Sequence, residues 1–236
     1  MSPEPYYQDE AVTLYVGDCR EVTEWLSADV LVTDPPYGIR YDRRRGTTWT
    51  KRTNRPNGFA MPADRPTQIS NDEDTSVRDL VLDEWARRPA LVFGDLKLAR
   101  PAGTVKTLIY RKPPDSGTHG AIAGFRHDIE VVHLLGDGWP VGVGGRSSIL
   151  ETGARGVGSP SGMAARYGHP HAKPVDVMET LIGACPPGII ADPFAGSGST
   201  LVAARNLGRR VIGVEIDERY CERIARRLSQ PILESE

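Results

Sequence analysis

The sequence predicts an α/β protein built on one doubly wound, mainly parallel sheet of seven strands. Short apolar runs rich in Val, Ile and Leu alternate with segments whose apolar residues recur at helical spacing. Such alternation is typical of parallel strands joined by helices that cover both faces of the sheet. Two of the strands also end in a carboxylate that leads into a distinctive loop, "DPPY" at 34–37 and "DPFAGSGST" at 192–200. A length of 236 residues suits a single domain over 1–236 with one large core.

Seven segments have the length and apolar content of buried strands. They are 11–18, 29–34, 89–95, 104–112, 128–136, 189–192 and 209–217. Helical spacing is clearest where Val77, Val81 and Trp85 form one apolar face. Helices are expected at 20–27, 75–88, 173–182, 199–207 and 219–228. Gly208 is expected to end the helix before it, because glycine readily adopts the left-handed conformation found at helix C-termini.

The composition is that of an ordinary globular protein, with 39% hydrophobic and 25% charged residues. No apolar run approaches the roughly 18 residues that a membrane span needs. The first residues, "MSPEPYYQDE", are polar and acidic, unlike a signal peptide. Cys19, Cys185 and Cys221 lack the spacing of a metal or redox site, so we expect free thiols in a cytoplasmic protein and no metal.

Two loops depart from the regular alternation. The first, 38–70, carries eight basic side chains against two acidic ones, although the whole chain has a formal net charge of −2. The basic residues are Arg40, Arg43, Arg44, Arg45, Lys51, Arg52, Arg55 and Arg65. A locally basic loop can follow the phosphates of a nucleic acid, but it is equally typical of a solvated insertion. The second loop, 137–168, is rich in glycine, and a loop of that length is either functional or disordered.

The loop at 192–200 indicates a ligand site. A glycine-rich turn between a strand and a helix presents backbone N–H groups and the positive end of the helix dipole. Glu215 ends the next strand about 20 residues on, where an acid often binds ribose hydroxyls. Leu201 replaces the third glycine of the dinucleotide motif, and no lysine completes a P-loop. S-adenosylmethionine, which has an adenosine but no phosphate, therefore fits better than a dinucleotide; a purely structural turn is the alternative.

The two motifs lie far apart in the sequence but can meet in the fold. In a doubly wound sheet, ligands bind beyond the carboxyl ends of the strands, where the strand order reverses. If Asp34 and Asp192 end neighbouring strands at that point, their loops face one crevice. We therefore expect a single site that contains both motifs.

Together, "DPPY", "HPHAKPVDVMETLI", "DPFAGSGST" and "GRRVIGVEID" resemble the motifs of the DNA amino-methyltransferases. Their order is that of the circularly permuted, β-class enzymes, which place the catalytic motif first and the cofactor loop last. The likeness covers 11–42 and 169–228 and is weaker across 43–168. The resemblance implies a Rossmann-like, S-adenosylmethionine-dependent methyltransferase fold of seven strands, with the last one antiparallel.

The resemblance also assigns residues to the cofactor. It implies that Asp18 and Cys19 line the adenine pocket and that Glu215 binds the ribose. It implies that the glycine loop surrounds the methionine portion, with Lys173 near the methionine carboxylate. The residues expected around the cofactor are Asp18, Cys19, Lys173, Asp192, Pro193, Phe194, Ala195, Gly196, Ser197, Gly198 and Glu215.

The catalytic motif, Asp34, Pro35, Pro36 and Tyr37, suits methyl transfer to an exocyclic amine. Such an amine is a poor nucleophile because its lone pair is delocalised into the base. The Asp34 carboxylate and the Pro35 carbonyl can accept its hydrogens and restore the lone pair, and the two prolines fix that carbonyl. Tyr37 offers a face on which the base can stack, worth roughly 1–3 kcal/mol. Holding the two reactants at near-attack distance supplies much of the rate.

A base within double-stranded DNA cannot reach Asp34, so it must be flipped out. The basic loop follows Tyr37 directly and is expected to contact phosphates, while 137–168 lies where the family has its target-recognition region. Candidate DNA contacts are Arg43, Arg44, Arg45, Lys51, Arg52, Arg146, Arg155 and Arg166. Because the glycine-rich segment is short, we expect a short recognition sequence or the help of a homodimer.

Adenine N6 is the expected target, because in the resembling family the Asp form of the motif goes mostly with adenine and a Ser form mostly with cytosine. Cytosine N4 is an alternative, since the same acceptors serve its amine, and adenine in RNA is another. A nicotinamide-dependent oxidoreductase is disfavoured by the missing third glycine. A non-catalytic DNA-binding module is disfavoured by the intact motif at 34–37. Whether a restriction nuclease accompanies the enzyme is left open.

Overall fold

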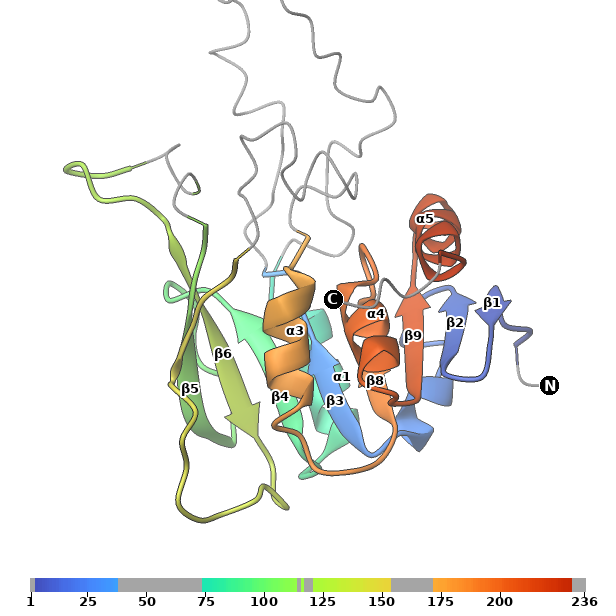
Figure 1. Cartoon of the computed structure of the whole chain (residues 1–236), viewed down its shortest axis with the longest axis horizontal. Coiled ribbons are helices and arrows are strands. Elements are labelled where there is room, and N and C mark those ends of the chain that lie inside the picture. Colours follow the sequence, from blue (N-terminus) through green and yellow to red (C-terminus); the bar gives the residue numbers. More distant parts are fainter. Residues whose placement is uncertain (1–2, 38–73, 114–115, 117–120, 154–171, 231–236) are drawn as a thin grey trace, which may run out of the picture.

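The computed structural model describes residues 3–37, 74–113, 116, 121–153 and 172–230, which form a nine-stranded sheet with helices on both faces (Figure 1). The strands are β1 (Tyr7–Gln8), β2 (Val12–Val16), β3 (Val30–Thr33), β4 (Ala90–Gly94), β5 (Thr104–Arg111), β6 (Ile129–Leu135), β7 (Ile149–Leu150), β8 (Ile190–Asp192) and β9 (Val211–Glu215). The helices are η1 (Glu24–Ser27), α1 (Ser76–Trp85), α3 (Val175–Ile182), α4 (Ser199–Asn206) and α5 (Glu218–Leu228). The predicted loop 38–70 and part of 137–168 lie outside the described residues.

The sheet order is β1-β2-β9-β8-β3-β4-β6-β5-β7. The five strands from β2 to β4 are parallel, which confirms the predicted doubly wound core. All seven predicted strands are present, and the short β1 and β7 extend the two edges. Among the seven, β6 alone is antiparallel, pairing in that direction with both β4 and β5. One of the seven is antiparallel, as the resemblance implies, but the expectation that it is the last one is wrong, because β8 and β9 follow β6 in the chain and are parallel to their neighbours.

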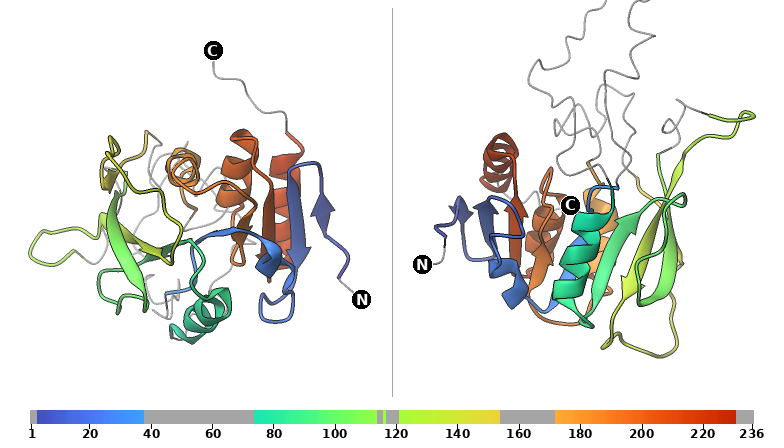
Figure 2. Two further views of the ribbon diagram at one scale, coloured as in Figure 1. Left: turned by 90° about the horizontal axis from the view of Figure 1, so that it is seen from below. Right: turned by 180° about the vertical axis from the view of Figure 1, so that it is seen from behind.

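Side chains alternate between two cores on opposite faces of the sheet. Along β3, Val30 and Val32 join the core shared with α3, α4 and α5, whereas Leu31 joins the core shared with α1 and η1. Figure 2 shows α1 on the face opposite α3 and α4. In the second core, the buried rings of Trp25 and Trp85 stack with their centroids 5.9 Å apart. All residues of β3 and β4 are buried, as expected for parallel strands covered on both faces.

Three predicted helices are clearly shorter in the structure, and the one expected at 75–88 spans only Ser76–Trp85. The helix expected at 173–182 begins at Val175, because Pro174 restricts the residue before it to extended conformations. Lys173 is therefore held outside the helix. The segment expected at 20–27 forms only the single 3₁₀ turn η1.

The strand order reverses between β8 and β3, since the chain passes from β8 to β9 on one side and from β3 to β4 on the other. β3 and β8 pair directly, with Val30 opposite Ile190 and Leu31 opposite Ala191. The catalytic and glycine-loop motifs therefore follow adjacent strand ends, where α/β sheets bind ligands. None of the described helices has the length and apolarity needed to span a membrane.

Candidate functional site

A direct hydrogen bond joins the residue before the catalytic motif to the first residue of the glycine loop. Thr33 Oγ1 donates to Asp192 Oδ1 at 2.7 Å, and the Phe194 amide donates to the same oxygen at 3.2 Å. Asp192 is buried, and burial raises its pKa to about 6 although hydrogen bonds from Thr200 and Thr33 oppose the shift. The prediction that Asp34 and Asp192 end neighbouring strands is confirmed.

Asp34 is held by two neighbours. The Tyr37 hydroxyl donates to Asp34 Oδ1 at 2.7 Å, and the Lys173 ammonium lies 2.7 Å from Asp34 Oδ2. The Asp34 side chain keeps 25% exposure, whereas the Lys173 side chain keeps only 8%. Burial and the nearby Asp34 carboxylate hold the pKa of Tyr37 well above its ordinary value, so its hydroxyl remains a donor. The carboxylate is thus reachable from outside while its cationic partner is buried.

Lys173 lies between two carboxylates. Its ammonium is 3.0 Å from Glu130 Oε2 as well as 2.7 Å from Asp34, and 4.9 Å from the centroid of the Phe93 ring. Its backbone carbonyl accepts a hydrogen bond of 2.7 Å from Ser199 at the start of α4. Lys173 therefore connects the catalytic motif with the glycine loop. The predicted contact between its ammonium and a methionine carboxylate stays a prediction.

Sequence reasoning missed Glu130 and its second partner, Lys112. Glu130 is buried near the start of β6, and its Oε1 lies 2.8 Å from Lys112 Nζ. Burial alone would raise the pKa of Glu130, but the ammonium groups of Lys173 and Lys112 lower it to about 2. The available signal was a single carboxylate within the apolar run "IEVVHLL".

The glycine loop is held by β9 and α5. The Ala195 amide donates to the Val214 carbonyl at 2.9 Å, and the Arg227 guanidinium donates to the Ser197 carbonyl at 2.8 Å. Gly198 precedes α4 with a φ of +77°, and a Cβ at this position would lie 2.9 Å from Ile224 Cγ1. A side chain would therefore strain the backbone and displace α5.

Glu215 ends β9 beside this loop. Its Oε2 accepts a hydrogen bond of 2.7 Å from the Gly196 amide, and its Oε1 accepts one of 2.9 Å from the Asp217 amide. Burial raises the pKa of Glu215 to about 7, although these backbone hydrogen bonds oppose the shift. Two amides do not use all the lone pairs of a carboxylate, so Glu215 can accept further donors. A buried carboxylate with spare acceptor capacity fits the hydroxyls of a ribose.

Asp18 and Cys19 follow β2, the neighbour of β9. The Gly17 amide donates to the Glu215 carbonyl at 2.9 Å, which brings this turn to the end of β9. Arg20 forms an ion pair of 2.5 Å with Asp18. The Cys19 carbonyl accepts from the Trp25 indole at 2.9 Å, and burial raises the pKa of the Cys19 thiol to about 12. The positions of Asp18 and Cys19 are compatible with an adenosine that Glu215 also contacts, and their contacts with adenine stay a prediction.

Most of the predicted DNA contacts lie outside the described residues. These are Arg43, Arg44, Arg45, Lys51, Arg52, Arg155 and Arg166. Arg146 is described, and its guanidinium donates to the Gly183 carbonyl at 3.0 Å, just beyond the end of α3. Lys173 precedes the other end of this eight-residue helix, about 12 Å away along its axis. Because β6 is antiparallel to β4, the chain leaves β6 beside the amino ends of the parallel strands (Figure 1). Asp34 follows the carboxyl end of β3, on the opposite side of the sheet's strand ends. A contact between Arg146 and DNA stays a prediction.

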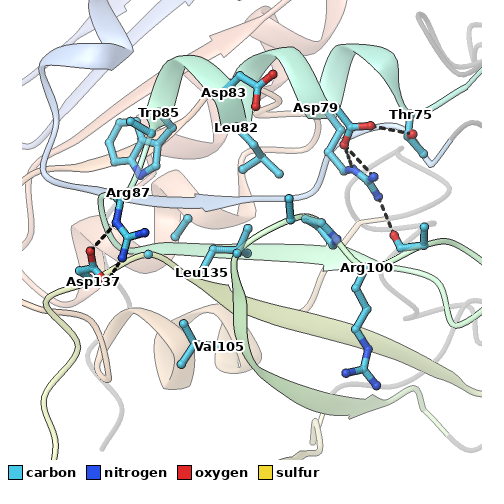
Figure 3. Close-up of a pocket in the computed structure, with 18 residues that line it drawn as sticks. Thr75, Asp79, Leu82, Asp83, Trp85, Arg87, Arg100, Val105, Leu135 and Asp137 are labelled. Atoms are coloured by element: carbon cyan, nitrogen blue, oxygen red, sulfur yellow. Dashed lines mark hydrogen bonds and ion pairs between the residues drawn. The ribbon is translucent and has the colours of Figure 1, made fainter.

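A separate groove of about 570 Å³ lies beside α1. In Figure 3, the ion pair of Arg87 and Asp137, at 2.8 Å, stands at one end, and Asp79 stands at the other. Leu82 and Leu135 are among the apolar residues between them. The lining contains none of the residues predicted for catalysis or cofactor binding, so this groove is distinct from the site at the strand ends.

Comparison with known proteins gives the family. The family model described as "DNA methylase", of the N6 and N4 type, matches residues 150–227. The putative methylase YubD of Escherichia coli strain K12 is 30% identical over 211 residues, which cover 86% of this chain and 84% of YubD. The type II methyltransferase M.ScaI of Streptomyces caespitosus is 48% identical over 59 residues, which cover 24% of this chain and 19% of M.ScaI.

Solved structures share the fold. The M1.HpyAVI–SAM complex matches with a TM-score of 0.60 and 19% identity, covering 93% of this chain and 100% of that one. PvuII DNA methyltransferase, cytosine-N4-specific, matches with a TM-score of 0.61 and 15% identity, covering 98% and 90%. These likenesses confirm the predicted mainly parallel methyltransferase fold. YubD matches over most of both chains, and the two motifs follow the ends of the adjacent strands β3 and β8. The chain therefore belongs to the N6/N4 DNA methylase family.

Proposed function

We propose that this chain transfers a methyl group from S-adenosylmethionine to the N6 amine of a flipped-out adenine in double-stranded DNA. Membership of the N6/N4 DNA methylase family gives the class of reaction, methylation of an exocyclic amine in DNA. The observation that carries the proposal is the partly exposed Asp34 carboxylate, which follows the strand adjacent to the glycine loop. Adenine is favoured over cytosine because position 34 is Asp rather than Ser.

The cofactor residues fit S-adenosylmethionine, which supplies a methyl group on a sulfonium when it is bound. Glu215 accepts the ribose hydroxyls, and the turn at Asp18 and Cys19 borders the adenine. The glycine loop, with Gly198 in a conformation that other residues rarely adopt, lets the methionine portion approach the backbone. Two solved structures of the same fold were determined as complexes with this molecule, M1.HpyAVI and TTHA0409 of Thermus thermophilus.

The catalytic residues orient the amine. Asp34 Oδ1, which accepts from the Tyr37 hydroxyl in the free protein, accepts a hydrogen of the target amine instead. Lys173 keeps Asp34 Oδ2 in place during this exchange. The Pro35 carbonyl accepts the second hydrogen, so the lone pair of the nitrogen points out of the plane of the base. The ring of Tyr37 stacks on the base.

The rest of the proposal concerns DNA. The basic loop 38–70 binds phosphates on either side of the flipped base, and the part of 137–168 after β7 contributes to target recognition. The chain works as a single domain, as a monomer or a homodimer, within a restriction–modification system or as a solitary enzyme.

The deciding experiment incubates the full chain with S-adenosylmethionine and unmethylated double-stranded DNA. The DNA is then read by modification-sensitive sequencing, and its nucleosides are analysed by mass spectrometry. We expect N6-methyladenine at one short sequence. We expect Asp34→Ala to lose transfer while it still binds the cofactor, as measured by calorimetry. N4-methylcytosine would overturn the choice of base, and unmodified DNA would overturn the proposal.

A further inference from the structure

We propose that Glu130 is a positioning residue for methyl transfer, which fixes the orientation of the Asp34 carboxylate through Lys173. Lys112 completes the arrangement by pairing with the other oxygen of Glu130. The inference rests on the proposed function, because Asp34 is the group whose orientation limits the reaction. Neither Glu130 nor Lys112 belongs to the motifs at the strand ends.

Four charges of alternating sign form a chain that ends at Asp34. Lys112 Nζ lies 2.8 Å from Glu130 Oε1, Glu130 Oε2 lies 3.0 Å from Lys173 Nζ, and Lys173 Nζ lies 2.7 Å from Asp34 Oδ2. Each carboxylate oxygen in this series has a partner of its own, and the contact of Glu130 Oε2 with Lys173 is an ion pair without hydrogen-bond geometry. The inner pair is buried, with side-chain exposures of 9% for Glu130 and 8% for Lys173, while both outer side chains are 25% exposed. This series of four charged side chains therefore runs from the surface through the interior to the site.

Stability alone does not account for this arrangement. Removing two charges from water costs as much as their attraction returns, and apolar side chains of similar size often serve a fold equally well. Both inner groups nevertheless stay ionised. Burial would lower the pKa of Lys173, but the Asp34 and Glu130 carboxylates raise it above its ordinary value. What the arrangement supplies, and an apolar core would not, is a fixed ammonium beside the catalytic carboxylate.

Glu130 restricts the position of this ammonium. A lysine side chain has a long flexible stem, and the Tyr37 hydroxyl lies 3.3 Å from Lys173 Nζ as a competing partner. Glu130 is part of β6, which is hydrogen-bonded to β4 on one side and to β5 on the other. The sheet thus holds Glu130, Glu130 holds Lys173, and Lys173 holds Asp34. An error of about 1 Å in the reacting geometry can cost about a hundredfold in rate.

The test is Glu130→Gln in the full chain, assayed by methyl transfer to DNA. Gln keeps the size of the side chain but removes the charge that holds the ammonium. We expect kcat to fall about tenfold while KM for DNA and for the cofactor is unchanged, the pattern of an interaction that matters in the transition state. The matched control is Glu222→Gln, which removes one carboxylate of an exposed ion pair with Arg226 on α5. It should leave kcat unaltered.

The pH profile of kcat separates positioning from a structural role. Among the described residues, the charged or titratable groups that contact Lys173 Nζ are Asp34, Glu130 and the Tyr37 hydroxyl. Without Glu130 the pKa of Lys173 falls, so the ammonium is lost at a lower pH and Asp34 is released. The alkaline limb of the profile should therefore move to lower pH in Glu130→Gln. A purely structural residue would leave the limb in place.

Lys112→Met is a second variant, milder because Lys112 is partly exposed at the end of β5. It should lower kcat less than Glu130→Gln does, and it should add little to that variant, since both act through the same path. It decides the matter if Glu130→Gln does not fold. Wild-type kcat and pH profile in the folded variants would overturn the inference and leave the proposed function intact. Absence of methylation by the wild-type chain would instead defeat the proposed function.

Discussion

Thr33 Oγ1 donates a hydrogen bond of 2.7 Å to Asp192 Oδ1 across 159 residues of sequence. The bond joins the last residue of β3 to the last residue of β8. Both residues are buried, with exposures of 1% and 2%. The hydrogen bond thus fixes the end of the strand that carries the catalytic motif to the end of the strand that carries the cofactor loop. The two halves of the site are therefore held in one position relative to each other.

Thr33→Val is expected to destabilise the fold by about 1–3 kcal/mol at neutral pH, because it leaves a buried carboxylate with one donor fewer. The loss should shrink in acid. The Thr33 hydroxyl favours the ionised form of Asp192, whose pKa burial raises to about 6, so its contribution is present above that pH and disappears as the carboxylate is protonated. Urea unfolding at several pH values measures it.

Thr180→Val is the control, since the exposed Thr180 hydroxyl donates to the Asp176 carbonyl of its own helix. A Thr33→Val loss no larger than that of Thr180→Val, or one independent of pH, would contradict the assignment.

Cofactor affinity should rise as the pH rises through about 7. Burial gives Glu215 a pKa of about 7 in the free protein, and ribose hydroxyls donate best to its ionised form. Binding should therefore release protons at and below this pH. Calorimetry in buffers of different ionisation enthalpy measures both quantities.

Glu215→Gln should weaken binding and flatten its dependence on pH, whereas Glu218→Gln, at an exposed position on α5, should change neither. Equal cofactor affinity in wild type and Glu215→Gln would refute the role of Glu215.

Gly198→Ala should cost more stability than Gly208→Ala. The two glycines have similar φ values, +77° and +66°, so alanine costs about 1–2 kcal/mol of left-handed backbone strain at either position. An added Cβ at 198 would also lie 2.9 Å from Ile224, whereas one at 208 would meet nothing within 4 Å. The difference between the two variants in chemical unfolding therefore isolates the contact between the loop and α5. Equal losses would mean that α5 does not constrain the loop.

Replacing Arg43, Arg44 and Arg45 together by alanine should weaken DNA binding and reduce its salt dependence. The slope of log K against log salt should become shallower by about 0.9 for each phosphate that the variant no longer neutralises. The expectation rests on the charge of the loop in the sequence. Fluorescence anisotropy at several salt concentrations measures it, with Arg226→Ala on the exposed side of α5 as the control. An unaltered slope would leave the loop as a solvated insertion.

The parts of the fold that could be predicted are those encoded locally. Each buried strand is a short apolar run, and each motif directly follows such a run, so the seven strands and the two strand-end motifs could be identified from the sequence. The strands β1 and β7 could not, because two residues carry no periodicity. Their pairing is decided by the neighbouring strands β2 and β5.

The environments of Glu130 and Arg146 depend on contacts far apart in the sequence. Glu130 meets Lys173 only because β6 is inserted between β4 and β5, which no local pattern specifies. Arg146 follows the same antiparallel strand and therefore lies toward the amino ends of the parallel strands, where it contacts Gly183. The sequence shows that both side chains are charged. Which groups they contact depends on the direction of β6, which the sequence does not reveal.

The order of the strands along the chain has a consequence for synthesis on the ribosome. β8 and β9 come late in the chain, yet they fill the space between β2 and β3, which come early. Until 190–215 emerges, a nascent chain has a gap in the middle of its sheet and two unpaired strand borders, the kind of surface that invites mispairing. The sheet therefore becomes continuous only after its last two strands have been translated. A chain released early lacks the glycine loop that we propose holds the methyl donor.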